Sequence, residues 1–190
     1  MNNTESEKYK IRKRIADLRR QFPARDKLAA DRVIADTLSS LPEWVKAKTV
    51  CIYVSLPEEV DTKNIINALL SDPYKSVIVP RVRRSGGLKL YKIHSINDLA
   101  SGSYSILEPR PDCQEIGTGE VDLFITPGVA FDRFGVRLGW GKGYYDTLLK
   151  KVKVPRIALA YSFQIVPQLP KMSYDIPVDK VITEKEIILI

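Results

Sequence analysis

The chain has 190 residues, of which 44% are hydrophobic and 28% are charged, and its formal net charge is +7. These proportions are typical of a globular protein and exclude an intrinsically disordered chain. No apolar run approaches the roughly 20 residues that span a bilayer, and the charged residues 1–14 lack the apolar core of a signal peptide. We therefore expect one cytoplasmic domain over residues 1–190, with no membrane partner.

Cysteine and histidine offer little chemistry in this chain. Cys51 and Cys113 form neither a disulfide framework nor a metal-ligand spacing. The single histidine, His94, ends a predicted strand, so a Ser-His-Asp triad would depend entirely on it. The sequence therefore argues against catalysis by a protein nucleophile of that kind.

The first basic segment, residues 8–20, carries seven cations against one acid, Asp17. Its apolar residues recur at helical spacing and predict an amphipathic helix: Ile11, Ile15, Leu18 and Phe22. Lys8, Arg12 and Arg19 border the apolar stripe of this helix. The remaining cations, which point further round, are Lys10, Lys13, Arg14 and Arg20. We expect Lys8 and Arg12 to reach an anionic ligand, and the second group to form a solvated face.

A second helix is predicted from about Arg25 to Leu41, with Pro42 just beyond it. Short apolar runs rich in β-branched residues then predict strands at residues 49–56, 76–82, 88–93, 121–127, 156–161 and 178–183. Helical patterns lie between them at residues 62–72 and 143–152. This alternation predicts an α/β sandwich with a mainly parallel central sheet.

The stretch "FDRFGVRLGWGKGYYD", residues 131–146, follows one of these strands and precedes a predicted helix. It matches neither a Walker A motif nor G-x-G-x-x-G. Gly139, Gly141 and Gly143 alternate with bulkier residues, so the backbone can wrap phosphate oxygens while Arg137 and Lys142 supply positive charge. A glycine-rich turn with solvated cations is the alternative interpretation.

The longer string "GVAFDRFGVRLGWGKGYYD" resembles the signature of the 5-formyltetrahydrofolate cyclo-ligase family, also called 5,10-methenyltetrahydrofolate synthetases. The resemblance extends to "KYKIR", "YVSLPEEVDT", "VPRV", "LEP", "DLFITPGVAFD" and "PVDKVITE". It implies a three-layer α/β/α sandwich of the NagB/RpiA/CoA-transferase-like type. It also implies a ligase that uses ATP and Mg²⁺ to convert 5-formyltetrahydrofolate to 5,10-methenyltetrahydrofolate, with release of ADP and phosphate.

Phosphoryl transfer needs charge neutralisation and alignment more than a protein nucleophile, which suits this chain. The resemblance assigns transition-state stabilisation to Lys142 and Arg137, and magnesium binding to Asp146 and Asp179. It assigns ATP binding to Lys8, Arg12, Arg137, Leu138, Gly139, Trp140, Gly141, Lys142, Gly143, Tyr144 and Tyr145.

The resemblance also assigns folate contacts to Leu56, Asp61, Trp140 and Tyr144. An acidic side chain can pair with the donors of a pterin ring, and aromatic or aliphatic side chains can cover its faces. The sequence departs from some relatives at Trp140, where they carry arginine or tyrosine, and at Asp61, where they carry glutamate.

Two other classes of function were considered. A nucleic-acid-binding module would explain the basic first helix, but its cations spread round most of the helix and no nucleic-acid motif accompanies them. An enzyme of similar fold acting on sugar phosphates or CoA esters is the second alternative, because fold does not fix function. We expect a monomer that binds no nucleic acid. The sequence leaves open whether the natural pterin is folate, polyglutamylated folate or a related carrier.

Overall fold

The computed structural model describes residues 3–83, 85–102 and 106–190. An eight-stranded sheet runs through it in the order β12-β11-β10-β7-β1-β2-β3-β6. The five strands from β11 to β2 are parallel, whereas β12, β3 and β6 run antiparallel to their neighbours. The strands of this sheet are β1 Thr49–Ile52, β2 Ser76–Val82, β3 Leu88–Ile93, β6 Gln114–Ile116, β7 Leu123–Thr126, β10 Arg156–Leu159, β11 Lys180–Ile182 and β12 Ile187–Leu189.

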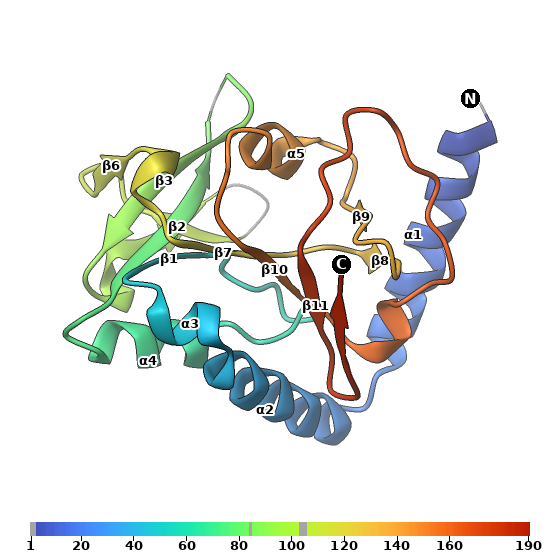
Figure 1. Ribbon diagram of the computed structural model, residues 1–190, viewed down its shortest axis with the longest axis horizontal. Helices are drawn as coiled ribbons and strands as arrows, with labels where there is room; N and C mark the ends of the chain where they lie inside the picture. The colour runs from blue at the N-terminus through green and yellow to red at the C-terminus, as the bar shows by residue number, and fades with distance from the viewer. Residues whose placement is uncertain (1–2, 84, 103–105) are drawn as a thin grey trace.

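Helices cover both faces of the sheet, as the sequence predicted (Figure 1). α2 (Ala24–Ser40), α3 (Pro42–Lys46) and α4 (Lys63–Ser71) lie on one face, and the short α5 (Tyr144–Leu149) lies on the other. α1 (Asn3–Gln21) stands at one end of the sheet, beside a small hairpin of β8 (Ala130–Phe131) and β9 (Arg137–Leu138). A second small pair, β4 (Leu99–Ser101) and β5 (Leu107–Pro109), completes the described strands.

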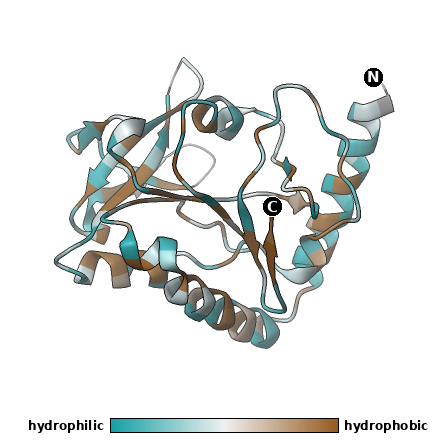
Figure 2. Ribbon diagram, viewed as in Figure 1, coloured by the Kyte–Doolittle hydropathy of each residue, from teal (hydrophilic) through white to brown (hydrophobic). Residues whose placement is uncertain are grey.

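The core follows the alternation of side chains along the central strands, which are the most hydrophobic part of the ribbon (Figure 2). Val50 and Ile52 face the cluster that contains α2, α3 and α4, whereas Cys51 between them faces Leu148 and Leu149 of α5. Because a parallel sheet is buried on both faces, its strands read as continuous apolar runs. This packing fixes the carboxyl ends of the strands in space.

The predicted elements agree with the structure except near their ends. The run 49–56 forms a strand only as far as Ile52, and residues 53–62 then leave the sheet as a buried turn. The sequence interpretation missed α3, β6, β12 and the two small pairs. These elements are five residues long or shorter, too short to show a helical or strand period.

The β8–β9 hairpin carries the glycine-rich stretch, and Asp132 holds it in place. The buried carboxylate of Asp132 accepts hydrogen bonds from the backbone N–H groups of Phe134 (2.9 Å), Val136 (2.9 Å) and Leu169 (2.9 Å). α1 packs against the same hairpin through the fully buried Ile15. The hairpin and α1 therefore form one support for the loop that follows β9.

Candidate active site

A cleft of about 480 Å³ opens where α1, the loop after β9 and the turn after β1 meet. It lies beyond the carboxyl ends of β1 and β7, the edge at which open α/β sheets bind ligands. Of the residues predicted for the site, the cleft is lined by Lys8, Arg12, Leu56, all of residues 137–145 and Asp146. Asp61 and Asp179 are not among the described residues that line it.

The glycine loop forms one end of the cleft, and its backbone requires glycine at two positions. Gly141 and Gly143 have φ angles of 98° and 66°, a region that side chains with a Cβ rarely adopt. The Nε of Arg12 donates to the carbonyl oxygen of Gly139 at 2.8 Å, so α1 braces the loop. Lys142 and Trp140 are exposed here and line the cleft. α5 has only six residues, so cations and loop amides supply most of the positive potential.

Arg137 lies under the loop, with only 3% of its side chain exposed. Its Nη2 donates to Oδ1 of Asp146 at 2.8 Å, and its guanidinium lies 5.5 Å from the centre of the Tyr145 ring. Among the described residues its Nε has no hydrogen-bond partner, an uncommon condition for a buried donor. The carboxylate and the ring therefore fix the guanidinium, and part of its donor capacity is unused.

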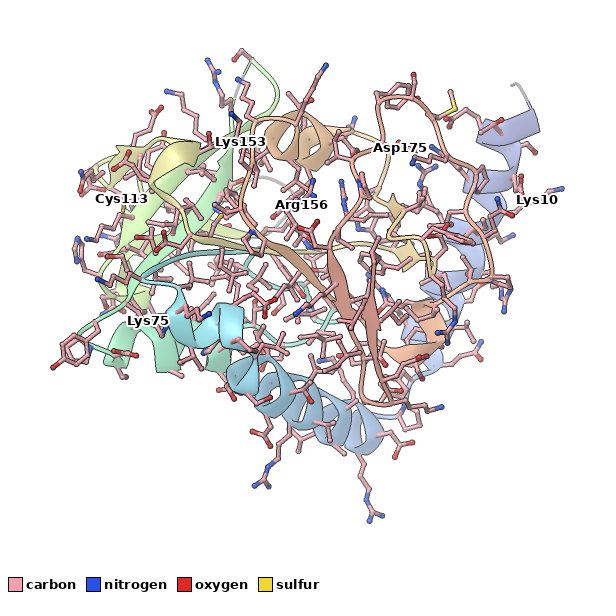
Figure 3. The ribbon with its side chains drawn as sticks, viewed as in Figure 1. Lys10, Lys75, Cys113, Lys153, Arg156 and Asp175 are labelled. Atoms are coloured by element: carbon pink, nitrogen blue, oxygen red, sulfur yellow. The ribbon has the colours of Figure 1, made fainter. Side chains whose placement is uncertain are left out.

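Asp175 is a cleft residue that the sequence interpretation missed. Its Oδ2 accepts from the ammonium of Lys8 at 3.0 Å, and both side chains are buried, with 9% and 7% exposed. The next residue, Ile176, donates its N–H to Asp146 at 3.4 Å. The segment around Asp175 therefore lies between α1 and α5, and it brings a second carboxylate to the wall that carries Asp146 (Figure 3).

Asp179 lies elsewhere, so the structure does not bring the predicted magnesium pair together. It precedes β11, which runs parallel to β10 and β7, and so it lies at the amino edge of the sheet, opposite the loop that follows β7. Its carboxylate accepts from Arg156 at 2.6 Å and 3.0 Å, in a separate cavity of about 320 Å³. In parallel strands, a residue before one strand and a residue after another lie at opposite edges.

The turn after β1 forms the other end of the cleft, where Glu59 rather than Asp61 faces the cavity. Glu59 is 7% exposed, and its Oε2 accepts from the N–H of Leu56 at 3.0 Å. Asp61 instead accepts from the N–H of Lys63 at 2.9 Å and from Asn64 at 3.3 Å, in the first turn of α4. No local pattern in "SLPEEVDT" separates the two carboxylates, because they are two residues apart in a turn whose burial follows no regular period.

Burial changes the ionisation of the titratable side chains at this end of the cleft. It raises the pKa of Glu59, against the opposing effects of the Leu56 N–H and Arg19. It also raises the pKa values of Tyr53 and Tyr145 well above their usual range, so both phenols are neutral at physiological pH. The apolar part of the same wall comprises Val54, Pro80, Val82, Leu88 and Ile106. This end can therefore hold a flat ring with apolar faces, whose hydrogen-bond donors meet a buried carboxylate such as Glu59.

No cluster of three or more His, Cys, Asp or Glu side chains is placed to hold a metal within residues 3–83, 85–102 and 106–190. A cation in the cleft would depend on Asp146 and Asp175 together with oxygen atoms from phosphate and water. Over the same residues, no helix is long and apolar enough to cross a membrane.

Comparison with known proteins gives a consistent result. The sequence profile of the 5-formyltetrahydrofolate cyclo-ligase family matches residues 4–184. A mouse 5-formyltetrahydrofolate cyclo-ligase is 32% identical over 94% of each chain. The mitochondrial 5-formyltetrahydrofolate cyclo-ligase of Arabidopsis thaliana is 34% identical over 83% of this chain and 67% of its own length.

Solved structures extend the comparison to the fold. The 5,10-methenyltetrahydrofolate synthetase of Aquifex aeolicus superposes with a TM-score of 0.86 and 37% identity, over 96% of this chain and 92% of the other. That of Mycoplasma pneumoniae, at 24% identity and a TM-score of 0.77, covers 94% of this chain and 99% of its own, and supports the fold alone. The chain belongs to the 5-formyltetrahydrofolate cyclo-ligase family.

Proposed function

We propose that the 480 Å³ cleft is where this chain performs the reaction of its family. That reaction is the ATP-dependent cyclisation of 5-formyltetrahydrofolate to 5,10-methenyltetrahydrofolate, catalysed by a ligase that forms a C–N bond. The observation that carries the assignment is that one cleft joins a cationic glycine loop to a buried wall that includes the carboxylate of Glu59.

The end formed by α1 and the glycine loop is proposed to bind ATP. Lys8 and Arg12 reach it from α1, and Lys142 reaches it from the loop. Backbone N–H groups of a loop with alternating glycines can approach phosphate oxygens closely, since no Cβ stands in the way. Arg137, whose Nε lacks a partner among the described residues, adds a fixed positive charge beneath them.

Magnesium is proposed to bind between Asp146 and Asp175. Both line the cleft, and the N–H of Ile176 ties the segment that carries Asp175 to Asp146. Two carboxylates together with phosphate oxygens and water are the ligands that this small hard cation accepts. Bound there, the ion would neutralise charge on the phosphate chain. Asp179, paired with Arg156 in another cavity, has no part in this proposal.

The end formed by residues 53–59 is proposed to bind the pterin ring. Glu59 would accept hydrogen bonds from the ring's amino and ring N–H groups. Leu56 and Val54 would contact its apolar face, and Trp140 and Tyr144 would contact it from the loop side. Asp61, which stabilises the first turn of α4, is not used.

With ATP and the pterin ring bound in this way, the N5-formyl group would lie between the two ends, next to the terminal phosphate of ATP. The formyl oxygen would attack the γ-phosphorus with release of ADP, while Lys142 and Arg137 stabilise the charge that develops on the phosphoryl oxygens. N10 would then attack the activated formyl carbon and lose its proton, and the C–O bond would break so that the formyl oxygen leaves as part of inorganic phosphate. No protein nucleophile takes part in this sequence.

The test is direct. The purified chain, mixed with 5-formyltetrahydrofolate, ATP and magnesium, should produce the near-ultraviolet absorption of the methenyl product, and omission of ATP should abolish it. Excess EDTA should do the same if the ion is required. Turnover of a sugar phosphate or a CoA ester, without folate turnover, would support the other enzyme class instead.

The same proposal covers the chain as a whole. We propose a single domain over residues 1–190, because one sheet takes strands from β1 to β12. We also propose that the protein is a cytoplasmic monomer. It should bind no nucleic acid, because three cations of the basic segment, Lys8, Arg12 and Arg19, face the interior or the cleft. Only part of that segment, such as Lys10, faces solvent (Figure 3). Size-exclusion chromatography, cell fractionation and a nucleic-acid shift assay test these points.

A further inference from the structure

A buried cation, Arg19, lies behind the pterin end of the cleft. It is on the inner side of α1, with 4% of its side chain exposed, and it is not among the described residues that line the cavity. Its Nη2 donates to the carbonyl oxygen of Gly128 at 2.7 Å, and its Nη1 lies 3.8 Å from Oε1 of Glu59. Arg19 therefore contacts two residues that do line the cavity.

These contacts are unusual in their chemistry. A buried guanidinium is costly unless its donors and its charge are matched, yet among the described residues the Nε of Arg19 has no hydrogen-bond partner. The carbonyl of Gly128 does not need Arg19, because Nε2 of Gln164 also donates to it at 3.1 Å. The ionised carboxylate of Glu59 is therefore the group that most requires this charge.

We infer that Arg19 is a positioning residue for the folate substrate, which holds the carboxylate of Glu59 charged and oriented toward the cleft. This inference rests on the proposed role of Glu59. Oε2 of Glu59 is held by the N–H of Leu56 at 3.0 Å, and Oε1 faces Arg19. The carboxylate is thus fixed from two sides, by one backbone donor and one cation.

The chemistry of the substrate explains why the charge matters. The pterin ring presents an amino group and a neighbouring ring N–H, both donors. An ionised carboxylate accepts two such hydrogen bonds, whereas a protonated carboxyl offers a donor of its own to one of them. Hydrogen bonds to a charged acceptor are also stronger than neutral ones. Loss of the charge would therefore weaken folate binding while leaving the ATP end intact.

The surroundings of Glu59 make its charge depend on Arg19. Burial raises its pKa, and the neighbouring Glu58 raises it further, whereas the Leu56 N–H and Arg19 lower it. The other titratable groups near it are the phenols of Tyr53, Tyr145 and Tyr161, which are neutral because burial raises their pKa values. Arg19 is therefore the cation that lowers the pKa of Glu59.

The experiment compares Arg19→Met with Arg20→Met. Arg20 is the next residue, but its side chain is 71% exposed and pairs with Asp17 at the surface, so the same chemical change is made without the cleft contact. Arg19→Met should raise the dissociation constant of 5-formyltetrahydrofolate, measured calorimetrically without ATP, about tenfold or more. The KM for ATP should stay unchanged, and Arg20→Met should change neither.

A pH series gives a signature that a purely structural role would not produce. Without Arg19, the pKa of Glu59 rises further, so the variant should lose folate affinity more steeply than the original protein as the pH is lowered across the range in which both stay folded. At the alkaline end the two affinities should converge. A constant ratio of affinities across this range would overturn the inference.

Two further variants keep the test decisive. Arg19→Lys retains the charge but lacks the guanidinium fork, so its folate dissociation constant should increase less than that of Arg19→Met. If no folded Arg19 variant shows an increase, the inference is overturned. In a Glu59→Gln background, Arg19→Met should cost no additional folate affinity, because residues that act through one contact are not additive. If Glu59→Gln alone leaves folate binding unchanged, the proposed role of Glu59 fails instead.

Discussion

The two ends of the cleft are built in opposite ways. At the ATP end, the glycine loop is exposed, with Trp140 55% exposed and Lys142 in contact with solvent. At the pterin end, the turn after β1 is buried and closed on itself: Thr62 donates from its hydroxyl to the carbonyl of Tyr53 at 2.7 Å, and its Oγ1 accepts from the N–H of Ser55 at 3.0 Å. One end is shaped by backbone, the other by packed side chains.

This difference shows where each end can be changed. An exposed loop has few contacts to lose, so substitutions there should affect the reaction without affecting stability. A buried turn loses packing, hydrogen bonds and function together. Matched pairs of variants, one member in the cleft and one beside it, can separate these effects.

The largest effect is expected at Lys142. Lys142→Ala should lower turnover by about 10²–10³-fold, because a preorganised charge at a developing phosphoryl oxygen contributes as an oxyanion donor does. Thermal unfolding should be unchanged, since Lys142 is exposed. Lys150→Ala, an exposed lysine at the end of α5, is the control for charge. Steady-state rates of methenyl formation measure both, and an active Lys142→Ala enzyme would remove this residue from the mechanism.

A second expectation compares Glu59 with Asp61 at the buried end. Glu59→Gln removes the charge that faces the cleft and should raise the KM for 5-formyltetrahydrofolate about 10–100-fold, the range of a hydrogen bond to a charged group. Asp61→Ala should leave that KM unchanged and lower the unfolding temperature, because it removes the acceptor of two hydrogen bonds at the start of α4. The reverse pattern would return the folate contact to Asp61.

The carboxylates provide a third comparison. Asp146→Asn and Asp175→Asn should each raise the magnesium concentration needed for half-maximal rate by about tenfold, the lower end of what altered metal surroundings typically cost. Asp179→Asn should not, because it loses only its pair with Arg156, which is partly exposed to solvent. Magnesium titrations at saturating ATP distinguish these cases. An increased requirement only in Asp179→Asn would restore the pair expected from the sequence.

Much of the fold and the whole glycine loop were predictable from the sequence. Residues 76–82 and 88–93 form strands with the predicted bounds, because each carries a local pattern of apolar residues. The first contains three consecutive buried residues, and the second has apolar residues between its two lysines. The loop at residues 137–145 lines the cleft throughout, because its glycines and cations are contiguous in the chain.

Two carboxylates assigned to the site, Asp61 and Asp179, do not line the cleft, and they show what a local pattern does not contain. Asp61 and Glu59 are two residues apart, and only the fold of the turn decides which faces the cavity. Asp175 and Asp179 are four residues apart, but the segment between them runs from the cleft to the amino edge of the sheet. Sheet polarity alone places Asp179 at the edge opposite the cleft, a constraint that the strand predictions already implied.

The smallest effect is expected on α1, where the comparison becomes one between two faces of a single helix. Lys8→Ala with Arg12→Ala removes two cations that line the cleft, whereas Lys13→Ala with Arg14→Ala removes two exposed ones. The first pair should raise the dissociation constant for ATP about tenfold, since charge-assisted hydrogen bonds to phosphate are lost. The second pair should leave it almost unchanged, because exposed charges are screened by salt.

Both pairs remove the same net charge, so isothermal titration with ATP at two ionic strengths separates the effect of position from the effect of charge. Equal losses, both declining with added salt, would mean that α1 attracts anions diffusely, and they would favour the nucleic-acid interpretation of this helix.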